Sequence, residues 1–367
     1  MASKVFFIDL RASAKENFIT KLGRLTDLSG LRDIVSENDL TAIKLHFGES
    51  GNTSFIRPIF IKKIVEMVKK AGGRPFLVDT NTLYAGSRRD SQRHIKTAIE
   101  NGFAYSVVNA PVIIADGLRG KNEEKVSVNG KHFKEVFLAS DIIDSDSIVS
   151  VAHFKGHELT GFGGALKNLG MGCASRKGKL IQHSTVAPMI TKKCIGCRTC
   201  TLKCPGNAIT VNENKKAVLD PKKCVGCGEC IIICPMEAIK INWNQDVSLL
   251  IEYMVEHAAG VIASKLGKIL FVNFICDISP SCDCADFNDA PIVRNIGVAA
   301  SYDPVAIDQA CLDLVNGEPG LSGSCVDGIV AGEDKFKVVH PQTKGELQLI
   351  HGEFLGIGSR QYELIAI

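Results

Sequence analysis

Two cysteine runs with the same spacing constrain this chain more than any other feature of its sequence. The first run is Cys194-x2-Cys197-x2-Cys200-x3-Cys204-Pro205, and the second is Cys224-x2-Cys227-x2-Cys230-x3-Cys234-Pro235. Three thiolates at this spacing can surround one iron–sulfur cube from a tight loop, while the fourth turns away toward a second cube. The pattern therefore predicts two [4Fe–4S] clusters.

The same spacing predicts which cysteines share a cluster, because the last cysteine of each run ligates the other cube in bacterial-type ferredoxins. One set is expected to be Cys194, Cys197, Cys200 and Cys234, and the other Cys224, Cys227, Cys230 and Cys204. Structural zinc is the alternative, since paired C-x2-C knuckles also bind zinc. Zinc needs four thiolates per ion and no third cysteine at this spacing, so the iron–sulfur interpretation is favoured.

The rest of the chain alternates apolar strands with amphipathic helices, which indicates an α/β fold with a mostly parallel sheet and helices on both faces. Strands are expected at 5–10, 41–46, 74–79, 112–115, 147–152, 268–275 and 362–367, and helices at 58–71, 87–101, 247–263 and 304–315. The rhythm stops at the cysteine runs and resumes after them. We therefore expect an α/β domain in two parts, 1–188 and 244–367, with a small α+β ferredoxin-like domain inserted at 189–243.

Composition and cysteine usage limit which cellular compartment and which classes of partner are expected. A net charge of +3 and 6% aromatic residues do not indicate a nucleic-acid partner. The sequence starts without an apolar signal segment, and the apolar stretch 247–263 contains Glu252, Glu256 and His257, so we expect a core helix and no membrane span. Cysteines in cluster spacing without an export signal favour a reducing cytoplasm.

The cysteine region has its own charge pattern. Residues 188–243 carry nine Lys or Arg and four acids. Two oxidised clusters held by eight thiolates would nearly cancel this excess and leave basic rims. Such rims suit an acidic redox partner guided by electrostatic attraction. The alternative is that these lysines serve solubility.

A glycine-rich stretch from Val151 to Cys173 follows an apolar strand and carries the most unusual polar residues outside the cysteine runs. Loops after the strands of an α/β sheet are where ligands usually bind. The stretch and the residues after it contribute these candidates: His153, Lys155, His157, Lys167, Asn168, Lys177 and His183. We expect His157, Lys167 and His183 to converge around a metal or small-molecule ligand, with Lys155, Lys167 and Lys177 supplying positive charge.

Two further segments end strands and are expected at the same sheet edge. His46 lies in Lys44-Leu-His46-Phe-Gly-Glu49, and a C-x-C pair lies in Cys276-Asp-Ile-Ser-Pro-Ser-Cys282-Asp-Cys284. The pair, with Asp277, Asp283 and Asp286 nearby, could take a soft or borderline metal. A possible second metal site therefore comprises His46, His183, Cys282 and Cys284, and unligated thiols are the alternative. Asp303 before Pro304 is expected to cap a helix.

These segments resemble the domain-of-unknown-function family 362. The matching pieces are Lys44-Leu-His46-Phe-Gly-Glu49, Lys155-Gly-His157, Gly163-Gly-Ala-Leu-Lys167-Asn168, Cys282-Asp-Cys284 and Asp303-Pro-Val-Ala-Ile-Asp308. The resemblance spans nearly the whole chain and implies an iron–sulfur protein. It implies the fold and the clusters, and it does not imply a reaction.

A fainter likeness connects the glycine-rich stretch to the nickel-pincer lactate racemase family. The stretch His157-Glu-Leu-Thr-Gly161-Phe-Gly-Gly164-Ala165-Leu-Lys167, followed by His183, is similar to that family's catalytic segment. The likeness implies an acid/base role for His157, attachment of a pyridinium-derived cofactor to Lys167, and nickel binding by His183. Ala165 stands where that pattern has glycine, and a redox-neutral racemase needs no clusters.

The sequence therefore predicts a cytoplasmic iron–sulfur redox protein. Enzyme activity stays open, with oxidoreductase as the candidate class. Its two [4Fe–4S] clusters would relay electrons to or from an α/β domain with a metal or small-molecule pocket. Two alternatives stay open: a non-catalytic electron carrier or maturation factor that uses the α/β part as a docking platform, and a metal-cofactor enzyme on a racemase-like scaffold with structural clusters.

Overall fold

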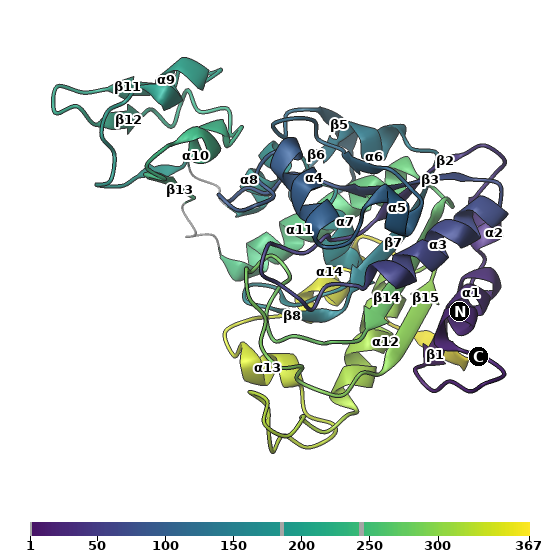
Figure 1. The fold of residues 1–367 in the computed structure, drawn as a ribbon. Helices are drawn as coiled ribbons and strands as arrows, with labels where there is room; N and C mark the ends of the chain where they lie inside the picture. Colours follow the sequence, from purple (N-terminus) through teal and green to yellow (C-terminus); the bar gives the residue numbers. More distant parts are fainter. Residues whose placement is uncertain (1, 184–186, 242–245) are drawn as a thin grey trace.

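The computed structural model describes residues 2–183, 187–241 and 246–367 (Figure 1). Its centre is an eight-stranded sheet in the order β16-β1-β15-β14-β7-β2-β3-β4. The strands are β16 (Tyr362–Ala366), β1 (Ser3–Asp9), β15 (Gly297–Ser301), β14 (Ile269–Ile275), β7 (Ser147–His153), β2 (Leu40–Lys44), β3 (Arg74–Asp79) and β4 (Val112–Ile114). Neighbouring strands pair in parallel, except that β15 runs antiparallel to both β1 and β14. The predicted mixed α/β fold with a mostly parallel sheet is confirmed.

Helices cover both faces of this sheet, because side chains alternate between the two faces along each strand. Val149 and Val151 of β7 pack with the helices of one face, whereas Ile148 packs on the other. The first face carries α1 (Phe18–Leu28), α2 (Leu31–Ile34), α3 (Pro58–Lys70), α4 (Ser91–Glu100) and α5 (Tyr105–Val108). The second carries α7 (Ala165–Gly170), α11 (Val247–Ser264), α12 (Pro304–Asn316), α13 (Lys335–Val339) and α14 (Leu347–Phe354).

The smaller elements lie around this core. Two hairpins are β5 (Glu123–Ser127) with β6 (Glu135–Ala139), and β8 (Lys155–His157) with β9 (Gly161–Gly163). Helix α6 (Ser140–Asp144) follows the first hairpin, and α8 (Arg176–His183) leads toward the cysteine region. The helix expected at 87–101 begins only at Ser91, because Asp90 caps it by accepting a hydrogen bond from the Arg93 amide.

Helix α11 is long and apolar enough to cross a membrane by length and composition alone. In this structure 56% of its apolar window is buried. It packs against α7, α8 and α14. A buried core helix passes the same test of length and composition, so the criterion is weak evidence for a membrane span.

The cysteine region folds as a small body beside the sheet (Figure 1). It contains β10 (Met189–Ile190) paired with β13 (Ile239–Lys240), β11 (Ile209–Val211) paired with β12 (Ala217–Leu219), and two short helices, α9 (Thr199–Lys203) and α10 (Glu229–Ile233). Its expected C-terminal boundary at residues 243 and 244 lies outside the described residues.

The two halves of this body repeat each other in backbone conformation. Gly196 and Gly226 both have positive φ, of 70° and 69°. Arg198 and Gly228, which precede α9 and α10, also match at 63° and 66°. The expected pseudo-repeat of the two cysteine runs is therefore present in the fold as well as in the sequence.

Candidate functional site

A cavity of about 460 Å³ opens where β2, β3 and β7 end, at the carboxyl edge of the parallel part of the sheet. Loops that follow these strands supply most of its lining, as expected for an α/β sheet. The candidates on this lining are His46, His153, Lys155, His157, Lys167, Asn168, His183, Cys282 and Cys284. The structure thus brings most of the polar residues singled out in the sequence to one place. Their chemical roles stay predictions.

Helix α7 carries Lys167 and Asn168, and a buried carboxylate fixes its start. Asp308 on α12 accepts hydrogen bonds from the amides of Ala165 at 2.7 Å and Leu166 at 3.0 Å. Burial raises the pKa of Asp308 to about 6. A β-carbon at Gly164 would lie only 2.2 Å from an Asp308 oxygen, so this position accepts glycine alone. The second aspartate of the Asp303–Asp308 segment therefore positions the residues that face the cavity.

Asp303, the first aspartate of that segment, has the expected structural role. Its carboxylate accepts hydrogen bonds from the amides of Val305 and Ala306, both at 2.9 Å. It caps α12, and this prediction is confirmed.

A buried network of charges and amides lines the cavity near β2 and β3. The Lys44 ammonium lies 3.1 Å from Asp79 and 3.0 Å from the Asn168 side-chain oxygen. Arg88 lies between Asp79 at 3.4 Å and Glu49 at 3.2 Å. All these charged groups are at most 5% exposed and opposite charges face each other, which is the condition for keeping charges inside a protein.

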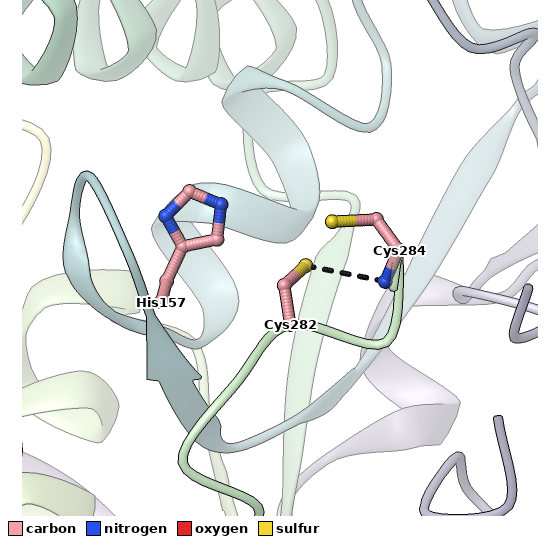
Figure 2. Close-up of side chains that lie close together, drawn as sticks. All are labelled: His157, Cys282 and Cys284. Carbon is pink, nitrogen blue, oxygen red and sulfur yellow. Dashed lines mark hydrogen bonds between the residues drawn. The ribbon is translucent and has the colours of Figure 1, made fainter. Parts of the chain in front are cut away.

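The C-x-C pair lines the same cavity as Lys167. It lies next to His157 (Figure 2). A nitrogen of His157 and the sulfurs of Cys282 and Cys284 all lie within 4.8 Å of one another. Lys167 places its Nζ atom 3.5 Å from the Cys282 sulfur. The hydrogen bond with Cys284, with help from Lys167 and His157, lowers the pKa of Cys282 well below that of an ordinary thiol. The pKa of Cys284 rises instead, because the two thiols share one proton.

Asp283 anchors the turn between these cysteines and is not available to the cavity. Its carboxylate lies 3.0 Å from Lys155 and 2.9 Å from Nδ1 of His153. Burial opposes the charge, but these two neighbours lower the pKa of Asp283 far below its usual range. Nε2 of His153 faces the Cys276 carbonyl at 2.9 Å, so the ring is held between that carbonyl and the Asp283 carboxylate.

Burial holds the cavity histidines His46 and His183 neutral. Burial and the charge of Arg88 lower the pKa of His46 well below its usual value. Burial lowers the pKa of His183 to about 4, although Nδ1 contacts the Lys179 carbonyl at 2.8 Å. Among the described residues, the group with metal-ligand spacing combines His157 with the two cysteines, and neither His46 nor His183 belongs to it. Two of the four predicted ligands, His46 and His183, thus lie outside this group, and metal binding by the C-x-C pair stays a prediction.

Two predicted contributors lie elsewhere. The Lys177 ammonium sits 3.7 Å from the centre of the Phe137 ring, away from the cavity lining. Lys179, two residues on, lines the cavity instead, and burial lowers its pKa to about 8. Asp277 pairs with Arg57 at 3.2 Å on the surface. The expectation that Lys177 contributes to the cavity was wrong, because residues two positions apart in a helix, such as Lys177 and Lys179 of α8, lie on different sides of it.

Sequence reasoning missed the acidic and basic residues of the wall, above all Asp79, Arg88 and Lys179. Asp79 ends β3 as Lys44 ends β2, so the rule that strand ends meet at one edge could have found it. Arg88 lies in a loop whose sequence carries no motif. Its position depends on the fold and could not be predicted locally.

Four of the eight cysteines of the two runs come together around one cavity. Cys194, Cys197, Cys200 and Cys234 line one small cavity of their own. Burial, followed by the neighbouring thiols of Cys227, Cys224 and Cys204, raises the pKa of Cys230 to about 12. All fourteen cysteines of the chain lie in the described ranges and are free thiols. Buried thiols that oppose one another's ionisation suit a bound metal centre, whose positive charge would favour the thiolates.

The second cysteine loop contacts the α/β domain. Glu229, the first residue of α10, lies 3.2 Å from Arg119, 3.3 Å from Lys121 and 3.7 Å from Arg176. Leu83 lines the large cavity and also packs in the hydrophobic cluster of the cysteine region. One apolar side chain therefore separates the cavity from the loop that carries Cys227 and Cys230.

Comparison with known families gives one decisive match. The family described as "Domain of unknown function (DUF362)" matches residues 41–313. This chain belongs to that family. Membership and the many cysteines indicate a metal-binding protein. The match includes β2, the glycine-rich stretch, the cysteine runs and the C-x-C pair.

Two individual proteins are similar to this DUF362 chain. A "Thylakoid-associated protein sll1697" of Synechocystis sp. is 24% identical over 164 residues, which are 43% of this chain and 46% of that protein. The aligned part thus spans less than half of that relative. The structure of the lactate racemase apoprotein from Thermoanaerobacterium thermosaccharolyticum aligns with 12% sequence identity and a TM-score of 0.38. The alignment covers 74% of this chain and 51% of the racemase chain. A structural likeness this weak supports no inference about chemistry.

Proposed function

We propose that this DUF362 chain is an iron–sulfur electron-transfer protein. Residues 189–243 would be a ferredoxin-like domain inserted between 1–188 and 244–367, with two [4Fe–4S] clusters that exchange electrons with the large cavity. The observation that carries the proposal is the grouping of Cys194, Cys197 and Cys200 with Cys234 around one cavity. Cys204 is nearer in sequence, and crossed grouping is the pattern of two-cluster ferredoxins.

Hydrogen bonds to sulfur also support cluster binding. The amides of Ala208 and Ala238 lie 3.3 Å and 3.2 Å from the sulfurs of Cys204 and Cys234, at equivalent positions of the repeat. The Ala217 amide lies 3.3 Å from the Cys194 sulfur. Amide donors of this kind stabilise thiolate ligands and tune cluster potentials.

A break in the pseudo-repeat indicates which cluster would serve the cavity. Arg198 of the first loop corresponds to Gly228 of the second, where a β-carbon would lie 3.1 Å from Leu83. Thr199 corresponds to Glu229, whose carboxylate contacts three basic residues of the α/β domain. The second loop thus differs from the first at both positions that contact the α/β domain, Gly228 and Glu229. The cluster of Cys204, Cys224, Cys227 and Cys230 would be the one that exchanges electrons with the cavity.

The other cluster would face external partners. Cys197 is exposed, and the exposed apolar side chains of Ile195 and Leu202 lie in the same loop and helix. The basic residues near this loop and helix in the sequence are Lys192, Lys193 and Lys203. An acidic redox partner would fit such a basic rim with an apolar centre. The cavity favours this relay over a carrier without a substrate site.

Replacement of Cys204 by serine tests the crossed ligation. The variant should lose the cluster of Cys224, Cys227 and Cys230 and keep the one nearest to Cys204 in sequence. Electron paramagnetic resonance of the anaerobically reduced protein should change from a spin-coupled two-cluster signal to a single-cluster signal. The matched control is Cys325→Ser, which removes an exposed thiol outside both runs. An unchanged two-cluster spectrum in Cys204→Ser contradicts the proposal.

A further inference from the structure

The C-x-C pair has a geometry that suits reaction between its two sulfurs. The Cys282 carbonyl accepts a hydrogen bond from the Ala285 amide at 3.0 Å, which makes residues 282–285 a β-turn. The turn brings the Cys284 amide within 3.4 Å of the Cys282 sulfur, and the two sulfurs lie within 4.8 Å of each other. The Asp283 carboxylate between the two cysteines is paired with Lys155 and holds the turn, while Cys282 and Cys284 are the residues of the turn that line the cavity.

The groups that face these sulfurs are proton donors. Nδ1 of His157 accepts hydrogen bonds from the amides of Thr160 at 3.0 Å and Leu159 at 3.2 Å. The proton of the neutral ring is therefore on Nε2, the nitrogen that points toward the sulfurs in Figure 2. The Lys167 ammonium lies 3.5 Å from the Cys282 sulfur on the cavity side.

This arrangement is the reverse of a metal site. A metal-binding histidine offers a lone pair to the ion and donates its other ring N–H to an acceptor. Here the outer nitrogen of His157 accepts two amides, and the inner nitrogen carries the proton. The Lys167 ammonium, 3.5 Å from the Cys282 sulfur, would repel a cation bound to that sulfur. A thiolate surrounded by donors is instead the form that attacks a disulfide.

We propose that Cys282 and Cys284 form a redox-active dithiol that reduces a small-molecule disulfide in the cavity. The cavity, at about 460 Å³, has the size of a small-ligand site. The source of electrons rests on the proposed function, because each reduced cluster would return one electron to the oxidised pair. The cysteine pair exchanges two electrons, and each of the two clusters exchanges one.

The reaction balances in three steps. The Cys282 thiolate attacks one sulfur of the substrate disulfide, whose S–S bond breaks, and the leaving half takes a proton from Lys167. Cys284 then gives its proton to Lys167, and its sulfur attacks Cys282 and releases the second half, which takes a proton from water. Two electrons from the two clusters and one proton then restore the Cys282 thiolate and the Cys284 thiol. Together with the proton taken from water, one disulfide, two electrons and two protons yield two thiols.

Trapping experiments on the full-length protein test the dithiol itself. The protein is equilibrated anaerobically in mixtures of reduced and oxidised dithiothreitol, alkylated, digested and analysed by mass spectrometry. We expect a Cys282–Cys284 disulfide that appears as the mixture becomes oxidising, and a mixed disulfide on Cys282 when Cys284→Ser meets bis(2-hydroxyethyl) disulfide. Cys325→Ser should behave as wild type. Cysteines 282 and 284 that stay alkylatable in every mixture, or that are blocked by stoichiometric zinc, overturn the proposal.

A second experiment separates this inference from the proposed function. Photoreduced protein is mixed with bis(2-hydroxyethyl) disulfide, and reoxidation of the clusters is followed by visible absorbance. Wild type should reoxidise and Cys282→Ser should lose this reaction while keeping its iron. Equal rates in the two proteins overturn the electron link between clusters and dithiol. Protein without iron overturns the proposed function, and the trapping experiment then decides on the dithiol alone.

Discussion

Glu229→Gln should release the cysteine region from the α/β domain without damage to either cluster. Glu229 is 2% exposed in its side chain and meets three cations. Arg119 and Lys121 have side chains 58% and 50% exposed, so each contact is worth at most about 1 kcal/mol. Arg176 is 1% exposed, and removal of one partner from a buried pair costs about 3–5 kcal/mol.

Arg176 keeps two other acceptors, the carbonyls of Arg89 and Arg119, so we expect the lower end of this range. A loss of about 3 kcal/mol corresponds to a docking equilibrium weakened on the order of 100-fold. Hydrogen–deuterium exchange, measured anaerobically, should therefore rise around Leu83 and along α8, while the iron content and the resonance spectrum stay the same.

Glu237→Gln is the matched control for this change. It removes an acid from the same region, but its partner is the exposed Lys240 at 3.8 Å. Exchange around Leu83 that is equal in Glu229→Gln and Glu237→Gln would refute the view that Glu229 docks the second loop.

Three further outcomes follow from particular contacts. Gly228→Arg should displace the cysteine region from Leu83. Both clusters should stay in place, because the equivalent residue of the first loop, Arg198, already has this backbone conformation. Arg198→Gly is the control, and unchanged hydrogen–deuterium exchange at Leu83 in Gly228→Arg would contradict the docking contact. Asp283→Asn should lower the free energy of unfolding by about 3–5 kcal/mol in anaerobic denaturation, since buried Lys155 loses its counter-ion. A loss under about 1 kcal/mol would argue that this buried pair does not stabilise the fold. Burial raises the pKa of Asp308 from its usual value of 3.8 to about 6, so its contribution to stability is full below 3.8 and is lost as pH rises through 6. Wild type should lose up to about 3 kcal/mol relative to Asp308→Asn over this pH range, and parallel pH profiles of the two proteins would contradict this.

Periodicity was enough to predict most of the central sheet. Arg74–Asp79 matches β3 at both ends, because a short apolar run between glycines and a polar loop has few alternatives. Helix α1 was missed although Asn17 caps it and accepts a hydrogen bond from the Thr20 amide. Strand β15 was missed together with its antiparallel direction, since Gly297–Ser301 is a short run and its partner strand β1 is distant in sequence.

The candidate site was predictable where strand ends supply it. His46, His157 and the C-x-C pair follow strands, and parallel strands gather such loops at one edge. The role of Asp283 was not predictable, because a carboxylate between two cysteines looks like a ligand until its partners are known. His153 and Lys155 point at it from β7 and β8, which follow each other in sequence but lie far from Asp283 along the chain.

Iron, acid-labile sulfide and zinc in anaerobically reconstituted protein test the central claim most directly. Two clusters held by the eight run cysteines require about eight iron atoms and eight sulfides per chain. A count of four iron atoms would leave one cysteine group without its cluster. Stoichiometric zinc without sulfide would contradict the account, because the cysteine runs would then be structural and no electrons could reach the cavity through them.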